Sequence, residues 1–395
     1  MDFQLTDEQR MLKETVYKWA VDYLGPLQEK IDEEDWFPPD FFKKCAEIGI
    51  LGITMDEKYG GLGGDILMQA LAIEEMSRIS PALGMTYGAH SNLCANNIHK
   101  NANEALKEKY LPPLIAGEKV GALGLTEPNA GSDALEGMRT RAVKKGDKYI
   151  LNGAKMFITN GPIADTILVY AKTAPERGAK GISAFIVEKD FPGYAVSRKL
   201  KKCGMRGSPT AELTFEDCEV PAENLVGVEN MGVNVVTSGL DYERIVLAGG
   251  SVGMARQALE YSIRYAVQRE QFGQPIANFQ MIQQKLADMY ARTEASRLLV
   301  YRAAQVAQEA KRGGKGTELT KQAAAAILFA SESATWVCDQ AVQIHGGYGY
   351  CLEFPVQKLW RDAKLYEIGA GTSEIRRMII ARELTREEFV RKAQR

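Results

Sequence analysis

The stretch KYILNGAKMFIT, residues 148–159, decides the fold, because it interrupts a chain whose pattern is otherwise helical. It is rich in β-branched and aromatic residues, which favour strands. The Asn152-Gly153 pair in its middle predicts a tight hairpin turn. Similar short runs follow at 167–171, 182–187 and 211–215. Together these runs predict a β unit in the middle of the chain, extending to about Gly227.

Helical patterns flank this unit on both sides. From Thr6 to about Gly117 the spacing is helical, and it opens with a predicted capping box between Thr6 and Gln9. Further periodic stretches predict helices at 238–272, 279–313, 317–345 and from Thr372 onward, with a polar link at 312–316. Helices of this length favour a bundle that also packs against a second copy of the chain. We therefore predict an α+β fold, mainly α, divided into a helical domain (1–119), a β domain (120–231) and a helical bundle (232–395).

Composition narrows the class of function. The chain has 395 residues, 45% of them hydrophobic, and a formal charge of −2, so we expect a globular protein that does not bind nucleic acid. Apolar runs such as 167–171 are too short to cross a bilayer, and the opening MDFQ lacks the pattern of a signal peptide. We expect no membrane insertion and a cytoplasmic location of bacterial type; a processed mitochondrial matrix protein stays an alternative.

Several kinds of site find no support in the sequence. The six cysteines form no CxxC pair and only three histidines are present, so we predict neither a metal site nor a disulfide framework. We interpret His90 and His99 as structural. The Gly-rich segments 61–64 and 346–349 do not follow a strand in a βαβ unit, so we interpret them as turns. Chemistry in this chain is therefore expected from carboxylates or from a bound cofactor.

Two segments could approach a planar ligand. The polar turn TEPNAGSD (126–133) has small residues that let backbone amides come close to a ring or an anion. In the following segment, KMFITNG (155–161), a period of two places Phe157 and Thr159 on one strand face. An aromatic ring beside a hydroxyl can stack on a ligand and bind its edge.

These segments, with four others in the same order, make the chain resemble the acyl-CoA dehydrogenase family of flavoproteins. The other four are CGMRGSPTAEL (203–213), REQFG (269–273), QIHGGYGY (343–350) and YEIGAGTSEIRR (366–377). The similarity runs from about Leu5 to Arg382. Within the family, segments 86–94, 238–244 and 366–371 are most like those of the isovaleryl type. The implied fold is an N-terminal helical domain, a middle β-barrel-like domain and a C-terminal four-helix bundle.

The resemblance implies FAD as cofactor. Positions that match the family's flavin contacts are Leu123, Leu125, Thr126, Gly131, Ser132, Phe157 and Thr159, with Thr372 and Glu374 near the ribityl and pyrophosphate groups. Positions that match a contribution from a neighbouring subunit to the adenosine half are Arg269, Phe272, Gln343 and Gly347. We therefore expect a homotetramer, built as a dimer of dimers.

The implied reaction is α,β-dehydrogenation of an acyl-CoA, with electrons passed to an electron-transfer flavoprotein. Most relatives place the base at the position of Ala370, whose methyl group cannot accept a proton. The isovaleryl type uses a glutamate that matches Glu243, so Glu243 is the expected base, with Glu367 and Glu374 as competitors. The backbone N–H of Ala370 and a ribityl hydroxyl are the implied donors to the thioester oxygen.

Substrate contacts are implied at Leu93, Ser132, Asp241, Tyr242, Arg244, Gly369, Ala370 and Gly371. Small residues at 369 and 370 leave room for a branched acyl chain, and Leu93 is placed to close the pocket. Tyr242 departs from the isovaleryl pattern, in which Leu is usual. A short branched acyl-CoA is thus expected; another short, cyclic or aromatic acyl-CoA, an oxidase or monooxygenase that uses oxygen, and a non-catalytic scaffold are the alternatives.

Overall fold

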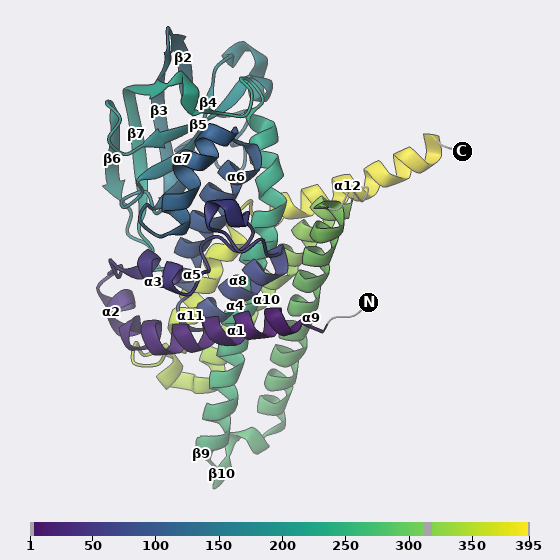
Figure 1. Ribbon diagram of the computed structural model, residues 1–395. Coiled ribbons are helices and arrows are strands. Elements are labelled where there is room, and N and C mark those ends of the chain that lie inside the picture. Colours follow the sequence, from purple (N-terminus) through teal and green to yellow (C-terminus); the bar gives the residue numbers. More distant parts are fainter. Residues whose placement is uncertain (1–3, 312–317, 394–395) are drawn as a thin grey trace.

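A computed structural model describes residues 4–311 and 318–393. Figure 1 shows a β unit at one end of the molecule, helices of the first third beside it, and long C-terminal helices running to the opposite end. The predicted order of helices, strands and helices is confirmed. The link predicted at 312–316 lies outside the described residues.

The first third is helical. Thr6 accepts from the Gln9 backbone N–H and the Gln9 side chain accepts from the Thr6 N–H, so the predicted capping box is confirmed. The helices are α1 (Asp7–Trp19), η1 (Ala20–Leu24), η2 (Gly25–Leu27), α2 (Gln28–Glu33), α3 (Phe41–Glu47), η3 (Glu57–Tyr59), α4 (Ile66–Ile79), α5 (Pro81–Gly88), η4 (Ala89–Asn96), α6 (Asn97–Asn101) and α7 (Glu104–Ile115).

The middle unit is an eight-stranded sheet in the order β6-β7-β3-β2-β4-β5-β8, with β1 paired in parallel to β4. Its strands are β1 (Gly121–Gly124), β2 (Arg141–Lys145), β3 (Lys148–Thr159), β4 (Thr166–Lys172), β5 (Ile182–Glu188), β6 (Tyr194–Lys199), β7 (Thr210–Pro221) and β8 (Leu225–Val226). The short helices η5 (Pro175–Gly181) and η6 (Ala222–Asn224) connect strands. β2 and β4 pair only at Arg141 and Lys172, so the sheet divides there into two parts, β6-β7-β3-β2 and β4-β5-β8 with β1.

The prediction of a hairpin turn at Asn152-Gly153 is wrong. β3 runs through these residues as one strand, and its register against β7 shifts between Leu151 and Gly153, which marks a bulge. Gly153 has φ +150°, and a Cβ there would lie 2.5 Å from Thr140 Oγ1, so only glycine fits. The tight turn lies instead at Gly146, between β2 and β3. In a sequence, a glycine that a β-bulge requires therefore cannot be told from a glycine that a turn requires.

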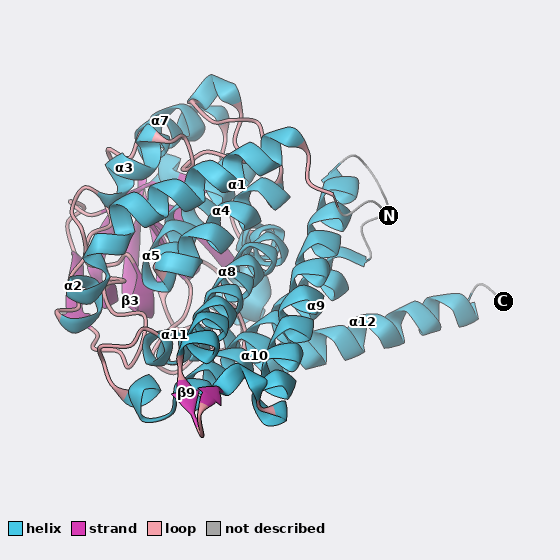
Figure 2. Cartoon of the chain, turned by 90° about the horizontal axis from the view of Figure 1, so that it is seen from below, coloured by secondary structure: helices cyan, strands magenta, loops and turns pink. Residues whose placement is uncertain are grey.

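The last part of the chain is a helical bundle. Its elements are α8 (Gly232–Gln268), β9 (Glu270–Gln271), β10 (Gln274–Pro275), η7 (Ile276–Asn278), α9 (Gln280–Lys311), α10 (Leu319–His345), η9 (Gly346–Tyr350), α11 (Val356–Ala363), η10 (Lys364–Glu367) and α12 (Ser373–Ala393). α8, α9 and α10 pack on one another, and α12 packs on α10. α8 begins earlier than predicted and ends at Gln268, because 269–272 forms part of a small hairpin. Figures 1 and 2 both show α12 extending away from the rest of the chain.

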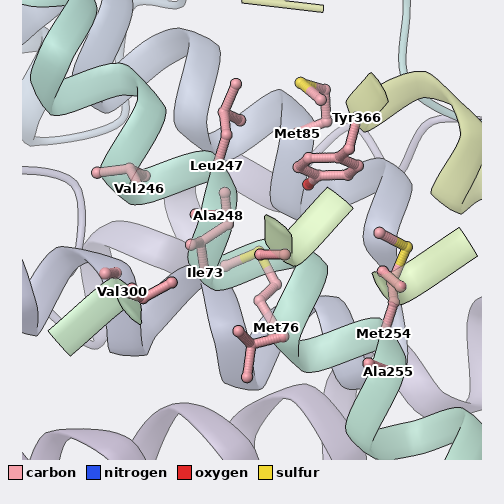
Figure 3. Close-up of a cluster of buried hydrophobic side chains, with 14 of the residues drawn as sticks. Ile73, Met76, Met85, Val246, Leu247, Ala248, Met254, Ala255, Val300 and Tyr366 are labelled. Atoms are coloured by element: carbon pink, nitrogen blue, oxygen red, sulfur yellow. The ribbon is translucent and has the colours of Figure 1, made fainter. Parts of the chain in front are cut away.

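The main core joins the N-terminal helices to this bundle. Figure 3 shows Ile73 and Met76 of α4, Val246 and Leu247 of α8, and Tyr366 of η10 in one cluster of buried side chains. Small residues allow the close approach: a Cβ on Gly253 of α8 would lie 2.1 Å from the Glu74 carbonyl oxygen. α8 is therefore packed closely against α4. None of the helices in the described ranges is long and apolar enough to span a bilayer.

Candidate active site

Glu243 lies on α8 and is buried, with 7% of its surface exposed. Burial raises the pKa of its carboxyl to about 7, while the charges of Arg244 and Arg376 act in the opposite direction. Burial also raises the pKa of Tyr170 of β4, with smaller contributions from Cys94 and Glu243. A buried carboxyl with a pKa near neutrality has the properties of a general base.

Arg244 and Asp241 flank this carboxyl in sequence and bind each other. Arg244 Nη1 donates to Asp241 Oδ1 at 2.8 Å, and Thr320 Oγ1 donates to Asp241 Oδ2 at 2.6 Å. Arg244 is buried and Asp241 is half-buried. Between them, Tyr242 lies under Lys100 of α6, whose Nζ is 3.0 Å from the ring centroid. Leu93 is half-buried on η4, which packs against α8.

The turn between η10 and α12 has an unusual backbone. Ala370 has φ +55° and Gly371 φ +86°, both in the left-handed region. Arg376 of α12 donates from Nη2 to the Gly369 carbonyl oxygen at 2.6 Å. At the start of α12, Thr372 Oγ1 accepts from the backbone N–H of Ile375 at 3.4 Å. The turn is thus anchored by the helix that follows it.

The polar turn after β1 is fixed by a buried ion pair. Lys155 of β3 is fully buried, and its Nζ donates to Glu127 Oε1 at 2.8 Å and to the Leu125 carbonyl oxygen at 3.1 Å. Glu127 also accepts from the backbone N–H groups of Arg139 and Thr140, at 2.7 and 3.0 Å. Burial lowers the pKa of Lys155 to about 8. The pair therefore holds the turn to the strand that carries Phe157.

An exposed aromatic side chain lies on the same strand, β3, as Lys155. Phe157 is 65% exposed, an unusual state for a phenylalanine in a strand, and its φ is +61°. Thr159, two positions along the same strand, is half-buried. In the neighbouring turn a Cβ on Gly131 would meet nothing within 4 Å. The register shift between Lys155 and Ile158 interrupts the alternation of side chains, so the placing of Phe157 and Thr159 on one face stays a prediction, while the space at Gly131 is open.

The other predicted cofactor positions fall into separate places. Leu123 lies in β1, and Leu125, Thr126 and Ser132 follow it in the chain, whereas Thr372 and exposed Glu374 lie at the start of α12. Arg269 and Phe272 lie at the β9–β10 hairpin, at the end of the bundle remote from the β unit (Figure 1). Arg269 lies over the ring of Tyr348 in η9, beside Gly347, so Gln343 and Gly347 belong to the same end. A single chain thus does not bring the two sets together.

Three site residues were not singled out from the sequence, namely Glu127, Lys155 and Arg376. Each lies within a quoted motif, but a charged residue in a sequence is normally exposed, and nothing in the motifs marked these as buried. The strand pattern offers no signal for Lys155. A period of two places Lys155 on the same face as Phe157, which is exposed, and so conceals the burial of the lysine. The bulge between Lys155 and Ile158 breaks that period.

The contacts of His90 and His99 are of a structural kind. His90 is fully buried; its Nδ1 accepts from the Gly121 N–H at 2.9 Å, its Nε2 lies 3.0 Å from the Leu114 carbonyl oxygen, and burial lowers its pKa to about 4. His99 lies 3.4 Å from Asp56. Within residues 4–311 and 318–393, no group of histidine, cysteine or acidic side chains could hold a metal ion.

A fold of helices, β unit and helical bundle, with a buried carboxyl near the arginine that binds the 369–371 turn, indicates a three-domain enzyme. The chain belongs to the acyl-CoA dehydrogenase family: the N-terminal domain model of that family matches residues 6–118, the middle domain model residues 122–218 and the C-terminal domain model residues 230–385. The resemblance drawn from the motifs, and the fold that it implies, are confirmed.

Among curated relatives, a mitochondrial isovaleryl-CoA dehydrogenase of Pongo abelii is 51% identical over 96% of this chain and 89% of its own length. A mitochondrial 2-methylacyl-CoA dehydrogenase of Solanum tuberosum is 49% identical over 96% and 91%. The two relatives are nearly equally similar to this chain and are named for different acyl groups.

Solved structures agree with this assignment. Butyryl-CoA dehydrogenase of Megasphaera elsdenii has a TM-score of 0.93 and 42% identity, over 98% of this chain and all, 100%, of the other. A chain in a structure described as the electron transferring flavoprotein of Acidaminococcus fermentans has a TM-score of 0.94 and 44% identity, over 97% and 99%. PigA, solved with FAD and proline, has a TM-score of 0.92 and 32% identity, over 98% and 99%.

Proposed function

We propose that this chain catalyses the FAD-dependent α,β-dehydrogenation of a short branched acyl-CoA to the 2-enoyl-CoA, with Glu243 as the base. The observation that carries the proposal is the buried carboxyl of Glu243, whose pKa is raised to about 7, in a chain that has a methyl group at Ala370. An enzyme that removes a weakly acidic α-proton near neutral pH needs a base of this kind.

The cofactor is FAD. The exposed ring of Phe157, the hydroxyl of Thr159 and the open turn at Gly131 and Ser132 would hold the flavin ring, and Thr372 and Glu374 its ribityl and pyrophosphate part. When bound, the flavin supplies an acceptor for the β-hydrogen as hydride. The Lys155–Glu127 pair organises this surface before the cofactor arrives, since it fixes the turn through four hydrogen bonds.

The chain's own residues then act on the thioester. The Glu243 carboxylate takes the α-proton, and the developing negative charge on the thioester oxygen is stabilised by the Ala370 backbone N–H. Tyr170 and the surrounding apolar side chains exclude water from the base, which keeps its pKa high. Arg244 and Asp241, together with Ser132, are proposed contacts of the CoA moiety.

The competing carboxylates are less suited to the role. Glu367 binds Lys364, with Nζ to Oε2 at 2.7 Å, so it is already paired with a cation. Glu374 is exposed, and its own backbone N–H and the Thr372 hydroxyl lower its pKa. A base with a lowered pKa has little driving force to take a carbon-bound proton.

The substrate assignment rests on space. A Cβ on Gly369 would meet only the Leu365 carbonyl oxygen, at 3.6 Å, and Ala370 adds a single methyl, which leaves room for a branched chain. Leu93 is the proposed end of the pocket. The similar relatives named for isovaleryl-CoA and 2-methylacyl-CoA support a short branched acyl group of either kind. Discrimination between acyl groups that differ by a methylene is worth only about 1–3 kcal/mol, so Tyr242 beside the base can shift the preference.

We further propose a homotetramer that passes electrons to an electron-transfer flavoprotein. The similar chain in a structure described by such a flavoprotein supports the partner. For the assembly, Met378, Leu384 and Phe389 are exposed apolar residues on the protruding α12, and Phe272 is 94% exposed at the far hairpin. Surfaces of this kind favour contact with another copy. The cytoplasmic location stays a prediction, because similar relatives include mitochondrial proteins.

The test is anaerobic bleaching of the flavin by a panel of straight, branched and cyclic acyl-CoAs. Short branched chains should bleach fastest, and Glu243→Gln should bind FAD and thioester but lose bleaching by orders of magnitude. Ala370→Glu in that background should restore part of the rate with straight chains. Wild-type bleaching in Glu243→Gln would remove Glu243 from its role, and fast reoxidation by air would favour an oxidase.

A further inference from the structure

The turn that carries Ala370 is hydrogen-bonded by an arginine, Arg376, to which the proposed mechanism gives no role. Arg376, in the first turn of α12, is the largest fully buried side chain among the described residues. It donates from Nη2 to the Gly369 carbonyl oxygen at 2.6 Å and from Nη1 to Ser331 Oγ of α10 at 3.0 Å. Its Nε is buried and has no hydrogen-bond partner in the described part of the chain.

Stability does not explain this arginine. Burial, and then the nearby charge of Arg244, lower the pKa of Arg376 to about 10, although Glu243, Glu332 and Glu367 attract it. Burying an ion is energetically costly unless all its donors are satisfied, and here one is not. A costly buried charge beside a proposed base is a feature of functional sites.

The geometry of the peptide bond links Arg376 to the reaction. The Gly369 carbonyl and the Ala370 N–H are the two ends of one planar peptide group, and the described chain has no cis peptide bonds. The two ends point in opposite directions, so a bond at the oxygen fixes the direction of the N–H. A charged donor at the oxygen also polarises the group and strengthens the N–H as a donor.

The backbone around this peptide needs such support. Ala370 and Gly371 both lie in the left-handed region, with φ +55° and +86°. For alanine this conformation is unfavourable and persists only when the surroundings impose it. Arg376 supplies support at this point, because its guanidinium donates to the carbonyl oxygen of the peptide group that joins Gly369 to Ala370.

We propose that Arg376 is a positioning residue, which aims and polarises the Ala370 N–H toward the thioester oxygen of a bound acyl-CoA. The inference rests on the proposed function, in which this N–H stabilises the developing enolate. Loss of one direct donor of this kind lowers kcat by about 10²–10³-fold. Because Arg376 acts through the peptide, its loss should lower kcat by about 10–100-fold and change KM little.

The test reads the thioester carbonyl directly. The holoenzyme is loaded with the product-like 3-methylbut-2-enoyl-CoA, labelled with 13C at the thioester carbonyl, and the isotope-edited vibrational spectrum is recorded. The wild-type protein should lower the carbonyl stretching frequency relative to water, and Arg376→Met should lose at least half of that shift. An undiminished shift in Arg376→Met would overturn the proposal.

Matched variants separate this role from a structural one. Arg377→Met removes the next arginine, which is exposed and binds Glu332, and Ser331→Ala removes only the second bond of Arg376; both should keep the full shift. Glu243→Gln should keep the shift while losing bleaching, so failure of the proposed base is seen separately. If Arg376→Met does not fold, Arg376→Lys serves: its ammonium sits on a shorter side chain and lacks the planar fork that places Nη2 on the Gly369 carbonyl oxygen, so the shift should fall, and a full shift again overturns the idea.

Discussion

Removal of Lys155 should destabilise the protein far more than removal of a neighbouring lysine on the same strand. Lys155 and Glu127 have side chains 0% and 6% exposed, whereas Lys148 and Glu219 form a pair of similar length, 2.7 Å, that is 38% and 45% exposed. Breaking a buried pair by deleting one partner costs about 3–5 kcal/mol. Breaking an exposed pair costs about 0–1 kcal/mol.

We expect Lys155→Met to lower the free energy of unfolding by about 3 kcal/mol, at the lower end of the range for buried pairs. The loss is limited because Glu127 keeps its hydrogen bonds from the backbone N–H groups of Arg139 and Thr140. The double variant Lys155→Met/Glu127→Gln should recover part of this loss, because no unpaired charge then stays buried. Lys148→Met is the matched control.

The assay is urea unfolding of the holoprotein at one fixed protein concentration, with FAD release followed by flavin fluorescence. Lys155→Met should unfold at lower urea and release FAD earlier, because the turn that fits the flavin is no longer tied to β3. Equal losses in Lys155→Met and Lys148→Met, or a double variant less stable than the single, would refute the assignment of the pair as a buried clamp.

Three other outcomes are expected. In stopped-flow bleaching at low substrate, the second-order rate should rise about tenfold from pH 6 to pH 8 with a midpoint near 7, because a Glu243 carboxyl with a pKa of about 7 accepts the α-proton only when ionised; a flat profile would contradict it. Gly253→Ala should lower thermal stability strongly, since its Cβ would lie 2.1 Å from the Glu74 carbonyl oxygen, whereas Gly25→Ala, with nothing within 4 Å, should not; equal melting temperatures would count against the close helix contact. Phe157→Ala should weaken FAD binding at least tenfold in equilibrium dialysis without loss of helix content, and unchanged affinity would show that the ring does not stack on the flavin.

The order of elements could be predicted because it depends on local patterns. Long periodic segments and the Thr6–Gln9 capping box are signals that lie within a few residues of each other. The start of α8 was predicted less accurately, at residue 238 instead of Gly232. Residues 233–237 are rich in valine, which disfavours helix, but Val235 and Val236 are buried against the β unit, so packing overrides propensity there.

The candidate site was predictable only in part. The role of Glu243 was expected from the resemblance to the isovaleryl type together with the missing carboxylate at residue 370, and it stays a prediction, which the burial of this carboxyl supports. The burial of Lys155 and Arg376 was not readable, because it depends on residues that are distant along the chain. The bulge at Gly153 was mistaken for a turn for the same reason: what distinguishes them is Thr140, which reaches Gly153 only in the folded sheet.

The distance between the β9–β10 hairpin and the flavin-facing surface of the same chain has a genetic consequence. In the proposed assembly each active centre takes Phe157 from one chain and Phe272 from another. Two inactive proteins, one altered at Phe157 and the other at Phe272, should therefore regain activity when they are co-expressed, because some mixed oligomers contain a centre in which both aromatic residues are intact. Such complementation would make an allele altered at one end tolerable in the presence of an allele altered at the other.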